Sequence, residues 1–150
     1  MFHVIDDQKY IAEMIGRLMG SLGYESSVFT SPEAYLEYVE SPDFKQPKGT
    51  ITDIDMPNIN GYEMMMRASR LRSNLRFTVM TGEPYIEHEF KHKACMYLTK
   101  PFRLPRLRLM AERMSVCAQG VVAAGDDSCT RCDNRMVFGI SGWECPHSVA

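Results

Sequence analysis

The chain has 150 residues, of which 45% are hydrophobic and 24% are charged, and its formal net charge is -2. These values are typical of a globular protein and exclude a chain that is disordered throughout. The balanced charge does not favour non-specific nucleic-acid binding, and no apolar run approaches the ~20 residues that a membrane span needs.

Short apolar or β-branched runs alternate with segments of helical period along the first 116 residues. The runs predict five strands, at residues 2–5, 26–29, 50–53, 77–81 and 96–99. Apolar residues three and four apart predict five helices, at residues 8–22, 31–41, 62–72, 83–93 and 104–116. With right-handed crossovers, this alternation predicts an α/β fold with a doubly wound, five-stranded parallel sheet.

Ionisable residues stand at the ends of three predicted strands. Asp6 and Asp7 follow the first strand, Asp53 ends the third, and Lys100 follows the fifth. Because ligands gather at the carboxyl ends of strands in such a sheet, we expect these side chains to converge on one crevice. Carboxylates are ligands that Mg²⁺ accepts together with water and phosphate, and an aspartate can attack phosphorus as a nucleophile. Thr81, at the end of the fourth strand, offers a hydroxyl to a phosphoryl oxygen.

Four motifs in this order carry a resemblance to a known family. They are Asp6-Asp7, the run DIDMPNING from Asp53 to Gly61, Thr81-Gly82, and the run YLTKPF from Tyr97 to Phe102. Together they resemble the receiver domain of bacterial two-component response regulators, over roughly residues 2–117. The resemblance implies a flavodoxin-like sheet of strand order 2-1-3-4-5. It also implies a phosphorelay switch that a sensor histidine kinase or a phosphotransfer protein phosphorylates in a Mg²⁺-dependent reaction.

The resemblance also implies a role for each matching residue. Asp53 would be the phosphoacceptor, Asp6 and Asp7 the metal-binding pair, and the main-chain carbonyl of Asp55 a further Mg²⁺ ligand. Thr81 and Lys100 would contact the phosphoryl group, and Tyr97 would be the aromatic switch residue. The last predicted helix has a basic face and would belong to the partner-binding surface; its arginines are Arg103, Arg106, Arg108 and Arg113.

Residues 118–150 differ in composition from the first 117 and read as a linker followed by a Cys-rich extension. Two cysteines three apart and a later Cys/His pair have ligand types and spacing typical of a zinc site; they are Cys129, Cys132, Cys145 and His147. A dithiol or disulfide between Cys129 and Cys132, or a disordered tail, is the alternative. The extension is too short for an ordinary helix-turn-helix domain. Direct DNA binding is therefore not expected, and output would pass through an unknown partner protein.

Two other functions fit parts of the sequence. A metal- or redox-responsive adaptor would signal through the Cys-rich extension. A haloacid dehalogenase-like phosphatase would use Asp53-Ile-Asp55, but in that family this motif lies on the first strand and the second acidic pair comes late. Here the acidic pair comes first, so we expect a switch and not an enzyme. The first strand begins almost at the N-terminus, leaving no room for a signal peptide, and a cytoplasmic location is expected.

Overall fold

The computed structural model describes residues 1–82 and 94–124, excluding the side chains of residues 116–124. The helix predicted at residues 83–93 therefore lies outside the described residues. So do the four candidate zinc ligands Cys129, Cys132, Cys145 and His147.

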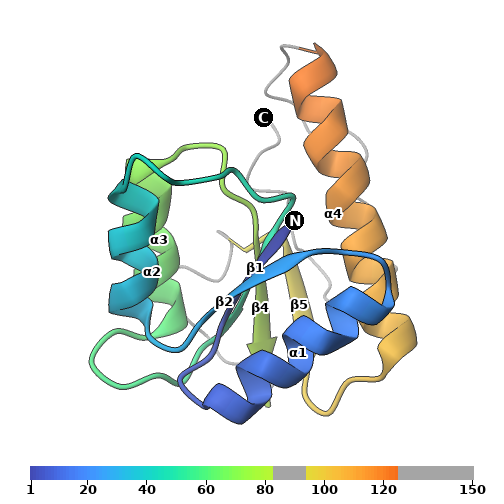
Figure 1. Ribbon diagram of the computed structural model, residues 1–150, viewed down its shortest axis with the longest axis horizontal. Helices are drawn as coiled ribbons and strands as arrows, with labels where there is room; N and C mark the ends of the chain where they lie inside the picture. The colour runs from blue at the N-terminus through green and yellow to red at the C-terminus, as the bar shows by residue number, and fades with distance from the viewer. Residues whose placement is uncertain (83–93, 125–150) are drawn as a thin grey trace.

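A parallel sheet of five strands forms the centre of the molecule (Figure 1). The strand order is β2-β1-β3-β4-β5, which confirms the predicted topology. The strands lie within one residue of the predicted positions; they are β1 (Phe2–Ile5), β2 (Ser26–Phe29), β3 (Thr50–Asp53), β4 (Phe77–Thr81) and β5 (Met96–Thr99).

Four described helices cover the two faces of the sheet: α1 (Lys9–Ser21), α2 (Pro32–Glu40), α3 (Gly61–Leu71) and α4 (Leu104–Ala124). Figure 1 shows α2 and α3 on one side of the sheet and α1 and α4 on the other. The Ser31 hydroxyl caps α2 by accepting a hydrogen bond from the Ala34 N–H at 3.1 Å. After α1, Gly23 has φ of +88°, a backbone conformation that glycine adopts at little cost.

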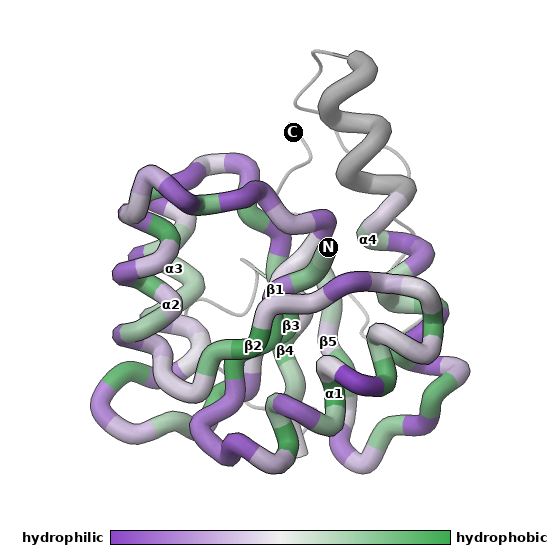
Figure 2. The backbone as a smooth tube through the Cα atoms, viewed as in Figure 1, coloured by the Kyte–Doolittle hydropathy of each residue, from purple (hydrophilic) through white to green (hydrophobic). Residues whose placement is uncertain are grey.

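Alternating side chains divide the hydrophobic core into two layers. In β1, Phe2 and Val4 pack with the cluster that contains residues of α1 and α4, whereas Ile5 packs with the cluster of α2 and α3. This is the two-residue period of a strand that is buried on both faces. Figure 2 shows the result as apolar strands enclosed by helices with mixed surfaces.

The ends of the described helices lie within one residue of the predicted positions, except the end of the last helix. The last helix was expected to end at Val116, but α4 continues to Ala124, so the first residues of the presumed linker are helical. No proline follows Val116 in this stretch, and the single Gly120 costs only about 1 kcal/mol relative to Ala in a helix. At the start of α3, Asn60 caps the helix by accepting a hydrogen bond from the Glu63 N–H at 2.9 Å.

A buried histidine occupies the amino end of the sheet. His3 is fully buried, and its ring makes edge contacts with four aromatic rings, those of Phe29, Tyr35, Tyr38 and Phe44. Its Nδ1 lies 3.1 Å from the Tyr35 hydroxyl, which lies 3.1 Å from the Thr50 hydroxyl. Burial, aided by the nearby positive N-terminus, lowers the pKa of His3 to about 4 and keeps the ring neutral.

Candidate metal and phosphoryl site

Three aspartates meet at the carboxyl end of the sheet, as the sequence predicted. Asp6 and Asp7 follow β1, and Asp53 is the last residue of β3, the neighbouring strand. One carboxylate oxygen from each of the three lies within 4.8 Å of the others. Asp6 and Asp53 are buried, and Asp7 is half-buried.

Lys100 places a cation beside these carboxylates. Its Nζ donates a hydrogen bond to Asp53 Oδ1 at 2.8 Å and lies 3.7 Å from Asp6 Oδ2. Its own N–H donates to the Thr81 carbonyl oxygen at 2.7 Å, which anchors the residue to β4. The peptide bond from Lys100 to Pro101 is cis. Three carboxylates and one ammonium leave two negative charges uncompensated within the cluster.

The electrostatics of Asp6 reflect this crowding. Burial is the largest cause that raises the pKa of its carboxyl group, and the negative charges of Asp53 and Asp7 add to the effect. The Gln8 N–H, which donates to Asp6 Oδ1 at 2.9 Å, and the Lys100 ammonium act in the opposite direction. Asp6 is thus held among like charges that a bound cation would neutralise.

The residues of this cluster fit a divalent cation. Asp6 Oδ2 and Asp7 Oδ1 are buried and have no hydrogen-bond partner among the described residues. Unpartnered buried carboxylate oxygens are costly, and they are the ligand type that Mg²⁺ prefers. Asp55, whose main-chain carbonyl was expected as a further ligand, lies in the loop directly after β3 with its side chain exposed.

Thr81 and Tyr97 lie on the two strands beyond β3. Thr81 is buried as the last residue of β4, and its register partner on β5 is Thr99, the residue before Lys100. Tyr97 is half-buried on β5 and packs against the α2 and α3 side of the core. Burial is the main cause that raises the pKa of its hydroxyl. The fold therefore brings Asp6, Asp7, Asp53 and Lys100 into one cluster and places Thr81 on the adjoining strand.

Sequence reasoning missed two neighbours of this site. Gly61 packs so closely on the loop after β3 that an added Cβ would overlap the main-chain oxygen of Asp53. Tyr62, the next residue, reaches the Tyr97 hydroxyl. The helix predicted at residues 62–72 placed Tyr62 in the first turn of a helix, but its contact with Tyr97, 35 positions away, depends on tertiary packing that the sequence pattern does not show.

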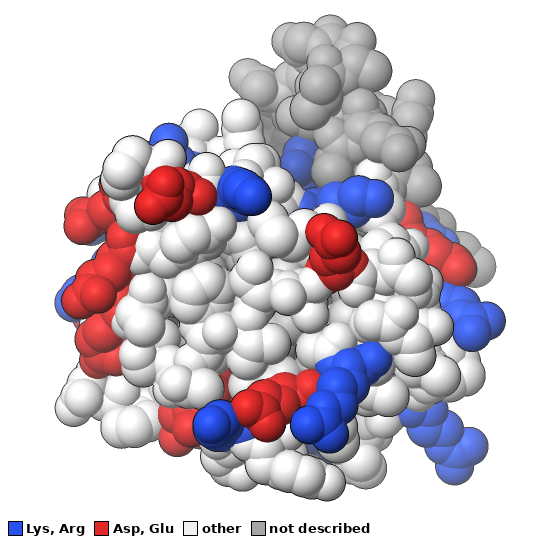
Figure 3. Space-filling view, in the orientation of Figure 1, with Lys and Arg blue, Asp and Glu red and all other residues white. Residues whose placement is uncertain are grey.

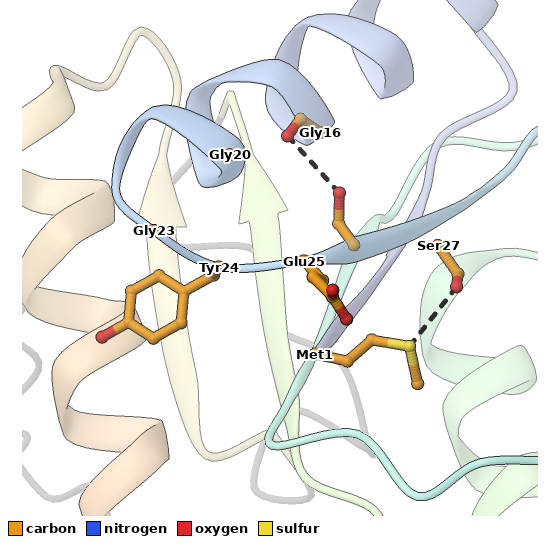
Figure 4. A pocket seen from close by; sticks show the side chains of 8 residues that line it. Met1, Gly16, Gly20, Gly23, Tyr24, Glu25 and Ser27 are labelled. Atoms are coloured by element: carbon orange, nitrogen blue, oxygen red, sulfur yellow. Dashed lines mark hydrogen bonds between the residues drawn. The ribbon is translucent and has the colours of Figure 1, made fainter.

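A separate groove of about 630 Å³ lies at the opposite end of the sheet (Figure 4). It is lined by α1 and the start of β2, including Gly16, Gly20, Tyr24 and Ser26, and the Ser26 hydroxyl donates to the Gly16 carbonyl oxygen. Because parallel strands share one direction, the start of β2 is remote from the carboxyl ends that carry the aspartates. The groove therefore plays no part in the acidic cluster.

On the face drawn in Figure 3, acidic residues gather along the left edge, and lysines and arginines are scattered over the rest of the face without forming one patch. Among the described residues, no helix combines the length and apolarity that crossing a bilayer requires.

Comparisons with known proteins agree with this architecture. The family model of the response regulator receiver domain matches residues 2–112. The transcriptional regulatory protein FixJ of Bradyrhizobium diazoefficiens is 28% identical over 113 residues, which are 73% of this chain and 54% of FixJ. FixJ of Azorhizobium caulinodans is 33% identical over 104 residues, 67% of this chain and 47% of that protein. The chain thus spans about half the length of these curated relatives.

A solved structure shows the same fold. The response regulator receiver domain protein from Clostridium thermocellum superposes with a TM-score of 0.68 at 19% identity, covering 80% of this chain and 97% of that one. Receiver domains typically bind Mg²⁺ at an acidic pocket, and the chain has its acidic cluster at the matching edge of the sheet. The family match covers well over half of the chain, and the chain therefore belongs to the response regulator receiver domain family.

Proposed function

We propose that this chain is a phosphorelay switch, phosphorylated on Asp53 by a sensor histidine kinase or a phosphotransfer protein in a Mg²⁺-dependent reaction. The observation that carries the proposal is the cluster of Asp6, Asp7 and Asp53 with Lys100 Nζ 2.8 Å from Asp53 Oδ1. A single cluster offers a nucleophile, a cation site and a fixed positive charge, which are the parts that phosphoryl transfer requires of a protein.

In the proposed reaction, a carboxylate oxygen of Asp53 attacks the phosphorus of the donor. A bond forms between that oxygen and phosphorus, and the bond from phosphorus to the donor breaks, with its electron pair leaving on the donor. Lys100 already contacts Asp53 and would donate a hydrogen bond to the transferred group. The buried hydroxyl of Thr81 would donate a second one.

Asp6, Asp7 and Asp53 would hold Mg²⁺ together with the main-chain carbonyl of Asp55. The bound cation would neutralise charge that the aspartates and the incoming phosphoryl oxygens share. Two buried carboxylate oxygens, one on Asp6 and one on Asp7, accept no hydrogen bond from the described residues, which supports this assignment.

Output is proposed to pass through protein contacts. The basic face on and beside α4 is formed by the exposed Arg103, Arg106 and Arg108 and the half-buried Arg113. In this proposal, it is a docking surface for a partner protein of opposite charge. Both FixJ proteins are named as transcriptional regulators, but the chain spans only about half of each, so their DNA-binding output is not transferred to it. A cytoplasmic location follows from the proposed kinase partner.

The test is phosphorylation by acetyl phosphate, followed by intact-protein mass spectrometry. We expect one phosphoryl group per chain in the presence of Mg²⁺, and none in Asp53→Asn or with the metal chelated. Asp43→Asn, which alters an exposed loop aspartate, is the matched control and should label like the wild type. Steady turnover of phosphomonoesters would instead indicate a phosphatase. Absence of labelling combined with a response to thiol oxidation would indicate the adaptor.

For the Cys-rich extension we make a separate proposal: Cys129, Cys132, Cys145 and His147 form a structural zinc site. Its support is the ligand types and spacing in the sequence. Elemental analysis of freshly purified protein should find close to one zinc per chain, lost in the double variant Cys129→Ser, Cys132→Ser. Protein without transition metal would refute this site and leave the receiver proposal intact.

A further inference from the structure

A buried tyrosine hydroxyl contacts the proposed switch residue. Tyr62 is 1% exposed in the first turn of α3, and its hydroxyl donates a hydrogen bond to the Tyr97 hydroxyl, with 3.4 Å between the oxygens. The two rings come from elements 35 positions apart in sequence, α3 and β5. Only the fold brings them together.

The main chain of Tyr62 is tied to the loop that carries Asp53. Its neighbour Gly61 donates a hydrogen bond from its N–H to the Ile54 carbonyl oxygen at 2.9 Å. A side chain at Gly61 would overlap the main-chain oxygen of Asp53, so only glycine allows this close approach. The Asn60 cap fixes the same turn of α3. A change in the loop at Asp53 therefore acts directly on the position of Tyr62.

Tyr97 stands at the edge of the core, with its ring partly in contact with solvent. It packs on the cluster of α2 and α3 residues that includes Tyr62, but it is only half-buried. A ring at such a border can leave the core for solvent without opening the sheet, because β5 is the edge strand next to β4. Burial and the contact with Tyr62 raise the pKa of its hydroxyl, so this group stays neutral and able to hydrogen-bond at physiological pH.

We propose that Tyr62 is a positioning residue of the switch, whose hydroxyl holds Tyr97 inward against the α2 and α3 side of the core. Through Gly61 it links the loop of the phosphoacceptor Asp53 to Tyr97, by a route separate from Thr81. This inference rests on the proposed function, because Tyr97 is the switch residue only in that account.

The expected size of the effect follows from the contact itself. An oxygen–oxygen distance of 3.4 Å exceeds the usual ~2.7–2.8 Å for hydroxyl pairs, so this hydrogen bond is weak. Its loss in Tyr62→Phe, which keeps the ring, should lower the ratio of inward to outward Tyr97 by about two- to fivefold.

The experiment measures how exposed Tyr97 is to solvent. The full chain is labelled with 3-fluorotyrosine, and the Tyr97 signal in the ¹⁹F NMR spectrum is identified by its loss in Tyr97→Phe. A soluble gadolinium chelate speeds the relaxation of signals from exposed groups. The size of this effect on the Tyr97 signal reports the fraction of molecules in which the Tyr97 ring points outward. Tyr35→Phe is the matched control, since it also removes a fully buried hydroxyl but lies at the amino end of the sheet, beside Thr50.

We expect the gadolinium effect at Tyr97 to rise two- to fivefold in Tyr62→Phe and to stay at the wild-type level in Tyr35→Phe. An unchanged Tyr97 signal in Tyr62→Phe, or an equal rise in both variants, would overturn the proposal. Urea unfolding verifies that each variant is folded; if Tyr62→Phe does not fold, Tyr62→Leu, which also lacks the hydroxyl, replaces it with the same expectation.

The test separates this inference from the proposed function. The comparison of Tyr97 exposure uses no phosphoryl donor, so it can fail while Asp53 is phosphorylated normally. Conversely, a wild type that takes up no phosphoryl group refutes the proposed function, whatever the fluorine signals show. A second arm adds Mg²⁺ and beryllofluoride, an aspartyl-phosphate mimic. The exposure of Tyr97 should fall less in Tyr62→Phe than in the wild type, and equal falls in the two proteins would contradict the link from Asp53.

Discussion

The two ends of the sheet bury ionisable groups in opposite ways. At the carboxyl end, Asp6 and Asp53 are buried beside the ammonium of Lys100, and the cluster keeps an excess of negative charge. At the amino end, His3 is buried among aromatic rings and held neutral. A charged group is tolerated inside a protein where other charges or ligands compensate it, and a neutral one where only rings and hydroxyls surround it. The difference separates a site that binds from a core that only packs.

The largest expected effect comes from removing the cation at the carboxyl end. Lys100→Met should reduce the rate of phosphorylation by acetyl phosphate about 10²- to 10³-fold, the range seen when one preorganised donor to a developing negative charge is lost. Lys48→Met changes a half-buried lysine that lies over the Tyr24 ring near the amino end, and serves as control. Equal rates in Lys100→Met and Lys48→Met would mean that Lys100 has no part in the transfer.

Lowering the pH should reduce the stability of the fold by protonating His3 at the amino end of the sheet. Because the folded-state pKa is lowered from 6.5 to about 4, the neutral ring contributes stability that is fully present above pH 6.5 and is lost as the pH falls towards 4. The total loss is about 3 kcal/mol. Urea unfolding across this range should show a wild type that weakens more steeply than His3→Asn, whose side chain does not titrate. Parallel slopes for the two proteins would contradict the assignment.

Removing the hydroxyl that contacts His3 should lower the stability of the fold without affecting the chemistry at the carboxyl end of the sheet. Tyr35→Phe leaves His3 Nδ1 and the Thr50 hydroxyl without their shared partner, at a cost of about 1–3 kcal/mol in unfolding free energy. Phosphorylation of Asp53 should be unaffected, because this end of the sheet takes no part in the chemistry. A matching loss of phosphorylation rate in the folded variant would show that the two ends are coupled.

Magnesium should produce an effect at the low end of this series. Binding to the folded state alone stabilises it by about 1.4 kcal/mol when Mg²⁺ is present at about ten times its Kd. Thermal unfolding should show this gain in the wild type and in Asp43→Asn, and lose it in Asp7→Asn. A gain that persists in Asp7→Asn would place the cation elsewhere.

Much of the fold could be predicted because the strands are short apolar runs that end at polar residues. Asp6, Asp53 and Lys100 could be expected to meet, since parallel strands align their carboxyl ends. The end of α4 could not be predicted, because small residues without proline continue a helix as readily as they form a linker. The surroundings of His3 could not be predicted either. The four aromatic rings around it come from a strand, a helix and a loop that only tertiary packing brings together. The contact of Tyr62 with Tyr97 depended on the same long-range packing.

The central claim is that the cluster of Asp6, Asp7, Asp53 and Lys100 receives a phosphoryl group on Asp53. It is tested most directly by locating that group: after reaction with acetyl phosphate, borohydride reduces an aspartyl phosphate to homoserine, and peptide mass spectrometry finds the position. We expect homoserine at position 53 with Mg²⁺ present and none with the metal chelated. Homoserine at another aspartate, or equal yields with and without the metal, would contradict the account.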